Sequence, residues 1–204
     1  MTLVDRLYRR LRYGAPIVVV SGLPRSGTSM AMKMLDAGGM PTLTDGIRTA
    51  DESNPKGYYE FERVKELDKN GDVAWLSGAR GHAVKIISFL LTFLPETFDY
   101  QVIFMDRDID EVLASQNKML VARGEAADSS QDPQMRQAYQ QHLLKVERFL
   151  RNRKCFTTMR LGYKAVIDNP AVEARRLNEF LGGRLNVERM TAVADRELYR
   201  NRKS

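Results

Sequence analysis

The stretch GLPRSGTS, residues 22–29, decides how the rest of the chain is interpreted. It follows the apolar run IVVVS at 17–21 and precedes MAMKML at 30–35, whose apolar residues have helical spacing. A glycine-rich loop between a strand and a helix is typical of a phosphate site, and its nucleotide-hydrolysing version reads GxxxxGK[S/T]. Gly22 and Gly27 fit that pattern, but Thr28 stands where the lysine belongs and Arg25 lies inside the loop. The loop therefore predicts an anion site with a different phosphate chemistry.

Apolar runs alternate with helical patterns along the rest of the chain. Strands are predicted at 16–21, at 84–87, at 100–107 and at 155–161, and helices at 27–37, 61–72, 109–120, 132–153 and 169–183. A β-branched, almost wholly apolar run such as PIVVVS is typical of a strand buried on both faces of a parallel sheet. The sequence therefore predicts an α/β fold, a P-loop-containing doubly wound parallel sheet flanked by helices, in a single domain spanning 1–204.

Composition limits the kind of ligand. The 204 residues are 43% hydrophobic, enough for a sizeable core, and the net charge is +6. A basic surplus favours an anionic ligand, although an ordinary basic surface would give the same total. The basic residues are scattered and form no stripe interleaved with aromatic residues, so nucleic acid is not expected as a partner.

Few residues are available for redox or metal chemistry. Cys155 is the only cysteine, which fits a reducing compartment, and the histidines His82 and His142 have no metal-ligand spacing. No apolar run reaches membrane-spanning length and no signal peptide is evident, so we expect a cytoplasmic protein without bound metal. The segment VDRLYRRLRYG at 4–14 predicts a short amphipathic helix, which either touches a membrane surface or packs on the domain.

A second charged segment, MDRDIDEVLAS at 105–115, follows the predicted third strand. Ligands bind at the carboxyl ends of parallel strands. Arg107 lies just past the strand, where we expect it to be partly exposed, and Ser115 follows about two helical turns later. Two anion pockets at one edge imply a ligand with phosphates at both ends. The alternative is a surface Arg107 paired with Asp108 or Asp110, beside an ordinary helical serine.

In order and spacing, these two segments and GYKAVIDNPAVEARRLNEFLG at 162–182 resemble the sulfotransferases that use 3′-phosphoadenosine 5′-phosphosulfate (PAPS). NPKGYYE at 54–60 also resembles a segment of small bacterial-type members, and the resemblance covers most of residues 16–183. In that family a PRSGT-type loop holds the 5′-phosphosulfate, and an arginine and a serine at this spacing hold the 3′-phosphate. The residues that the resemblance implies for PAPS binding are Arg25, Ser26, Gly27, Thr28, Ser29, Arg107, Ser115 and, near the adenine, Tyr163.

The resemblance accounts for the missing loop lysine. Sulfuryl transfer breaks no bond between the β and γ phosphates of a nucleoside triphosphate, so a triphosphate bridged by Mg²⁺ is not needed. A cation inside the loop can instead neutralise charge on the bridging oxygen of the leaving nucleotide. By position, Arg25 matches the basic loop residue of the family.

The sequence departs from the family at two places. The family often has Lys-Asp-Pro or Lys-x-Pro before the second pocket, whereas VKIISF at 84–89 keeps only Lys85. Lys85 either points at the transferring sulfuryl group or is an ordinary strand-end lysine. The family's Tyr-Glu-Asp appears as Tyr163-Lys164-Ala165, so Tyr163 either lies near the adenine or belongs to the core.

The acceptor must lose a proton as the new S–O bond forms, which calls for a Glu, Asp or His within reach. We favour Glu60, which ends NPKGYYE, and then Asp45, although both could be solvated loop carboxylates. His82 is a weaker candidate, and His142 lies in an amphipathic helix where packing is the simpler role.

The predicted function is transfer of a sulfuryl group from PAPS to a hydroxyl or amine of a small-molecule, sugar or lipid acceptor. Because loops on such scaffolds carry specificity, the acceptor site is expected between residues 40–62 and the polar loop 121–131. Two alternatives remain. One is a non-catalytic PAPS-fold protein that binds a nucleotide or partner as a regulator. The other is a divergent P-loop kinase, against which the missing lysine counts.

Overall fold

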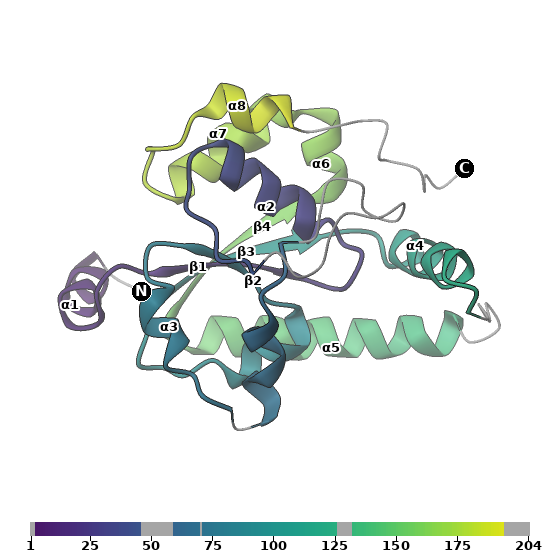
Figure 1. Cartoon of the computed structure of the whole chain (residues 1–204), viewed down its shortest axis with the longest axis horizontal. Helices are drawn as coiled ribbons and strands as arrows, with labels where there is room; N and C mark the ends of the chain where they lie inside the picture. Colours follow the sequence, from purple (N-terminus) through teal and green to yellow (C-terminus); the bar gives the residue numbers. More distant parts are fainter. Residues whose placement is uncertain (1–2, 46–58, 70, 126–131, 194–204) are drawn as a thin grey trace.

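The structure, a computed structural model, describes residues 3–45, 59–69, 71–125 and 132–193. Four strands form one parallel sheet in the order β2-β1-β3-β4 (Figure 1). They are β1 (Ile17–Gly22), β2 (Ala83–Lys85), β3 (Tyr100–Asp106) and β4 (Phe156–Gly162). All the carboxyl ends therefore lie at one edge, as the predicted parallel α/β fold requires.

Helices cover both faces of the sheet (Figure 1). One face carries α2 (Thr28–Ala37), α6 (Tyr163–Asp168), α7 (Pro170–Phe180) and α8 (Val187–Ala192). The other carries η1 (Glu62–Lys69), α3 (Trp75–Gly78), η2 (Ser88–Phe93) and α5 (Asp132–Asn152). Val18 and Val20 pack toward the first layer, and Ile17 and Val19 toward the second. The doubly wound arrangement is confirmed, and it explains why β1 is apolar at successive positions.

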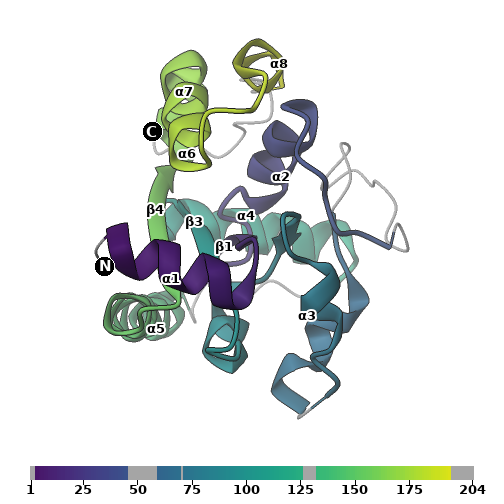
Figure 2. The same cartoon turned by 90° about the vertical axis from the view of Figure 1, so that its left-hand side faces the viewer.

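The remaining two helices lie at opposite ends of the strands. Helix α4 (Ile109–Ala122) lies beyond the carboxyl end of β3, and α1 (Leu3–Tyr13) lies across the end where the strands begin (Figures 1 and 2). Arg9 of α1 pairs with Asp99 and donates to the carbonyl oxygens of Glu96 and Phe98. These contacts hold α1 against the domain. Within the described residues, no helix is long and apolar enough to cross a membrane.

The second strand is shorter than predicted. β2 ends at Lys85, although the Ile86 amide still donates to the Val20 carbonyl at 3.0 Å. The chain then turns into η2, whose Ser88 and Leu91 are buried. An apolar run cannot by itself distinguish a strand from a buried helical turn, which is why the extended prediction to Ile87 was too long.

Candidate functional site

The loop between β1 and α2 has three residues with positive φ, which are Gly22 at 149°, Arg25 at 68° and Gly27 at 102°. A Cβ on Gly22 would lie 2.8 Å from the Met105 carbonyl oxygen, and a Cβ on Gly27 would lie 2.4 Å from the Tyr163 ring. Both glycines are therefore fixed by close approach as well as by conformation. A glycine adopts a positive φ at little cost, but the left-handed conformation of Arg25 costs a non-glycine residue about 1–2 kcal/mol.

Two hydroxyl groups are buried at this loop. The side chains of Ser21 and Ser26 are at most 1% exposed, and neither hydroxyl has a hydrogen-bond partner among the described residues. An unsatisfied buried polar group costs about 1–3 kcal/mol, which a bound anion could offset. Thr28 begins α2, so the loop leads directly into a helix N-terminus, where backbone amides and the helix dipole favour negative charge.

Arg107 lies against the same loop. Its side chain is only 7% exposed, so the expectation that it would be partly exposed is wrong. Its Nε donates to Glu111 Oε2 at 3.1 Å, and its Nη1 donates to the carbonyl oxygen of Arg25 at 3.0 Å. Its guanidinium carbon lies 4.3 Å from the centre of the Tyr163 ring. Arg107 thus joins the loop, the start of α4 and the start of α6.

Ser115 completes this group from α4. It is buried, and its Oγ lies 3.1 Å from Nε of Arg25, which donates to it. The two predicted anion pockets therefore adjoin, because Arg25 contacts Arg107 through its carbonyl oxygen and Ser115 through its side chain. We call Arg25, Arg107 and Ser115 the arginine cluster.

The two aspartates that follow Arg107 make contacts that hold α4 in place. Asp108 accepts hydrogen bonds from the amides of Asp110 and Glu111 and so caps α4. Asp110 pairs with Arg136 at 2.6 Å. Both carboxylates thus help to hold α4, and Arg107 forms an ion pair with Glu111.

Tyr163 is buried at the start of α6, directly after β4. One part of its ring lies against Gly27, and Arg107 lies over the ring. Its observed neighbours are thus the glycine loop and the arginine cluster, and its place near an adenine stays a prediction.

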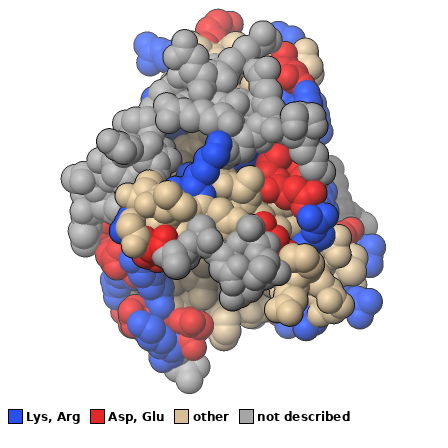
Figure 3. All heavy atoms as spheres, turned by 90° about the vertical axis from the view of Figure 1, so that its right-hand side faces the viewer, with Lys and Arg blue, Asp and Glu red and all other residues tan. Residues whose placement is uncertain are grey.

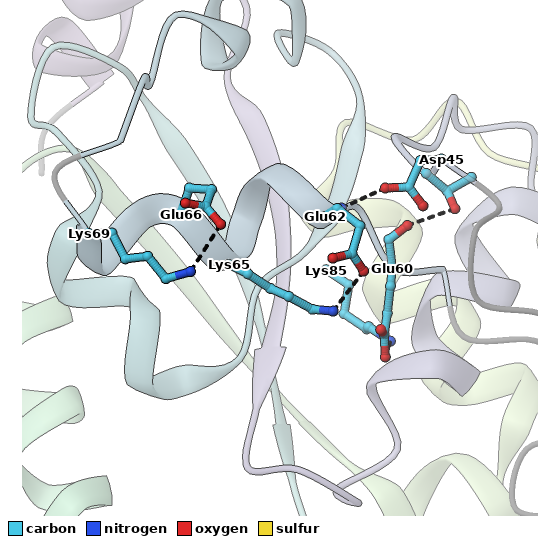
Figure 4. Close-up of polar contacts among 8 residues, drawn as sticks. Asp45, Glu60, Glu62, Lys65, Glu66, Lys69 and Lys85 are labelled. Atoms are coloured by element: carbon cyan, nitrogen blue, oxygen red, sulfur yellow. Dashed lines mark hydrogen bonds and ion pairs between the residues drawn. The ribbon is translucent and has the colours of Figure 1, made fainter.

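Lys85 and Glu60 form a second group at the same edge. Lys85 Nζ lies 3.7 Å from Glu60 Oε1, and the two side chains are 9% and 20% exposed (Figure 4). The Glu60 carbonyl oxygen accepts hydrogen bonds from the Thr44 hydroxyl and the Asp45 amide. The Asp45 carboxylate accepts the Glu62 amide at 2.6 Å, at the start of η1. Asp45 thus anchors the segment on which Glu60 approaches Lys85.

The histidines lie outside both groups. Nδ1 of His82 is 3.0 Å from the Arg80 carbonyl oxygen. His142 Nε2 is 2.9 Å from Ser88 Oγ, and its ring stacks on Phe89 with centroids 3.8 Å apart. Burial, aided by the nearby charge of Lys145, lowers the pKa of His142 below its usual 6.5.

Some predicted positions cannot be placed. Residues 46–58 and 126–131 lie outside the described residues, and with them most of NPKGYYE and much of the expected acceptor site. Among the residues that the structure describes, no three His, Cys, Asp or Glu side chains are grouped as metal ligands.

Sequence reasoning missed Glu111. Its signal was the spacing of four residues from Arg107, which lies just before α4, and its place in the first turn of that helix. The face of the molecule on which α4 lies carries both basic and acidic side chains among its described residues (Figure 3). An anion here would therefore depend on individually placed donors rather than on a field of one sign.

No family model matches the chain, and no curated protein matches it in sequence. Among solved structures, the chain is similar to the sulfotransferase STF9 from Mycobacterium avium, with a TM-score of 0.54 and 14% identity over 98% of this chain and 72% of that one. It also matches retinol dehydratase in complex with androsterone and the inactive cofactor PAP, with a TM-score of 0.47 and 17% identity over 93% and 67% of the two chains. The sulfotransferase domain from the curacin biosynthetic pathway gives a TM-score of 0.45 and 16% identity over 82% and 74%. At this identity the likeness to STF9 shows the P-loop-containing fold of a sulfotransferase.

Proposed function

We propose that this protein is a sulfotransferase that moves a sulfuryl group from PAPS to a hydroxyl or amine of an acceptor. The observation that carries the proposal is the arginine cluster, which joins a lysine-less glycine loop to a second arginine and a serine on α4. The fold that the chain shares with the sulfotransferase STF9 is consistent with this function.

The two ends of PAPS would have separate donors. Residues Arg25 to Ser29 would hold the 5′-phosphosulfate, using loop and helix amides and the hydroxyls of Ser26, Thr28 and Ser29. The buried Ser26 hydroxyl, which has no partner among the described residues, supports this assignment. Arg107 and Ser115 would hold the 3′-phosphate. Tyr163 would stand near the adenine while supporting the loop at Gly27.

Three side chains would have different roles in the transfer step. As the acceptor oxygen bonds to sulfur, Glu60 would take the acceptor proton, and Lys85 beside it would stabilise negative charge on the moving sulfuryl group. Arg25 would stabilise the charge left on the bridging oxygen of the departing adenosine 3′,5′-bisphosphate. We prefer Glu60 to Asp45 as the base because the Asp45 carboxylate already accepts the Glu62 amide.

The acceptor would be a small molecule, a sugar or a lipid that reaches Glu60 and Lys85. We expect the enzyme to work in the cytoplasm, because its single cysteine, Cys155, fits a reducing compartment. The Cys155 thiol is buried, and burial raises its pKa to about 11.

A second candidate is a nucleotide-binding regulator with the same fold. It is favoured by the sequence VKIISF, which keeps Lys85 but lacks the aspartate and proline of the family segment. Such a protein would bind adenosine 3′,5′-bisphosphate but would transfer nothing.

The proposal is tested with PAPS carrying ³⁵S and a panel of phenols, alcohols, amines and sugars. A labelled product that depends on both protein and acceptor supports the sulfotransferase. Calorimetry on the same preparation then compares adenosine 3′,5′-bisphosphate with ATP and Mg²⁺. Tight binding of the bisphosphate without any labelled product favours the regulator, and preference for ATP with Mg²⁺ favours a kinase.

A further inference from the structure

Glu111 contacts Arg107 but is not among the nucleotide contacts proposed above. We propose that Glu111 is a positioning residue of this site, whose carboxylate holds Arg107 in the orientation that fixes the glycine loop at Arg25. Its effect on nucleotide affinity rests on the proposed function, whereas its effect on the loop does not.

Burial distinguishes this ion pair from an ordinary surface pair. The side chains of Arg107 and Glu111 are 7% and 10% exposed, and their Nε–Oε2 distance is 3.1 Å. Exposed pairs contribute little because water and salt screen them, but removing one partner of a buried pair leaves a charge without compensation. Glu111 is itself held in place, because its amide donates to the Asp108 carboxylate at the start of α4.

The planarity of the guanidinium carries the effect from Glu111 to the loop. Once Glu111 fixes Nε and Tyr163 covers one face of the plane, the direction of Nη1 is fixed as well. Nη1 donates to the carbonyl oxygen of Arg25 at 3.0 Å. Arg25 has a φ of 68°, and such a conformation persists in a non-glycine residue only when surrounding contacts hold it.

A role through charge and a role through positioning predict opposite effects of Glu111→Gln on nucleotide affinity. A carboxylate near a phosphate pocket repels an anionic ligand, so on charge alone Glu111→Gln should tighten binding. If Glu111 positions Arg107, the same substitution should weaken binding although the site becomes more positive. Glu111→Asp keeps the charge and withdraws the carboxylate by one methylene, so positioning predicts weaker binding here too, whereas charge predicts no change.

The experiment measures affinity for adenosine 3′,5′-bisphosphate by calorimetry in the parent, Glu111→Gln, Glu111→Asp and a control, Glu173→Gln. Glu173 is a matched buried carboxylate, 8% exposed, paired with Arg176 at 2.6 Å on α7. We expect affinity to fall about tenfold in both Glu111 variants and by less than about twofold in the control. Binding as tight as that of the parent in either Glu111 variant would overturn the inference.

Hydrogen exchange gives a second readout that needs no ligand. The Ser26 amide donates to the Leu23 carbonyl oxygen at 3.1 Å inside the loop, so its exchange reports whether the loop keeps its shape. We expect exchange to be about tenfold faster in Glu111→Asp, which keeps the charge, and unchanged in Glu173→Gln. Unchanged exchange in Glu111→Asp contradicts the positioning role. If the parent fails to bind the bisphosphate, the proposed function fails, and the exchange measurement still decides the role of Glu111.

Discussion

The backbone of Arg25 helps to hold the loop, and its side chain has the proposed role in sulfuryl transfer. Its carbonyl oxygen accepts from Arg107, and its guanidinium donates to Ser115. Binding of the bisphosphate product draws on many donors, so Arg25→Ala should weaken it only modestly. The transition state differs, because charge grows on the bridging oxygen as the bond to sulfur breaks, and an interaction that strengthens at that moment raises turnover.

We therefore expect Arg25→Ala to lower sulfuryl transfer by about 10²–10³ at saturating PAPS, well beyond its effect on product affinity. Arg25→Lys should restore part of the rate, because it returns the charge without the planar fork. Turnover and calorimetric affinity are measured on the same preparations. An intact rate in Arg25→Ala, or a fall in affinity as large as the fall in rate, would remove Arg25 from the catalytic step.

His142 makes stability depend on pH. Its pKa is lowered in the folded protein, so the unfolded chain takes up the proton first as the pH falls. The contribution of neutral His142 to the free energy of unfolding is therefore fully present above the pKa of the unfolded state, about 6.5. It is lost as the pH falls from there through the lower pKa of the folded state. His142→Gln, which cannot titrate and can still bond Ser88, should lose less stability than the parent between about pH 7.5 and pH 5.5. Urea unfolding at the two pH values measures this. Equal losses in the parent and in His142→Gln would refute the assignment.

At the scale of elements, the unit formed by β1, the loop and α2 depends on Gly27. An alanine there would meet the Tyr163 ring at 2.4 Å and keep a φ of 102°. Gly39 offers a matched control, since its φ is 91° and a Cβ would meet nothing within 4 Å. Both substitutions incur the strain of a positive φ, but only Gly27→Ala must also move Tyr163 and disturb Arg107 above it.

We expect Gly39→Ala to cost about 1–2 kcal/mol in the free energy of unfolding, and Gly27→Ala to cost at least about 1 kcal/mol more. Denaturant midpoints of the two variants and the parent give both values. Equal costs would mean that the ring moves aside freely and that Tyr163 does not support the loop.

The sequence predicted most elements because their patterns were strong. The apolar run 17–21 and the glycine at each end of the loop specified β1 and the start of α2, and Pro170 marked the first turn of α7. The end of β2 was placed too late because buried helical turns and buried strands are equally apolar. The depth of Arg107 was missed, because a residue at a strand end looks exposed until its partners on other elements are known.

At the scale of the whole molecule, the site is assembled from segments far apart in the chain. β3 lies between β1 and β4, and this order brings the loop, the start of α4 and Tyr163 together. β2 lies on the other side of β1 and brings Lys85 to the same edge, where it meets Glu60. Each motif could be assigned to a strand end from the sequence. The contacts of Arg107 with the Arg25 carbonyl oxygen and with Glu111 could not, because they depend on strand order and side-chain packing.

The most direct measurement compares the affinities of the parent protein for adenosine 3′,5′-bisphosphate and for AMP, which lacks the 3′-phosphate. Both would use the glycine loop, and only the first would also use Arg107 and Ser115. A charged hydrogen-bonding group held in a second pocket should tighten binding at least about tenfold, so calorimetry should give affinities that differ by that factor or more. Equal affinities would show that the arginine cluster does not receive a 3′-phosphate, and PAPS would then not be the ligand of this protein.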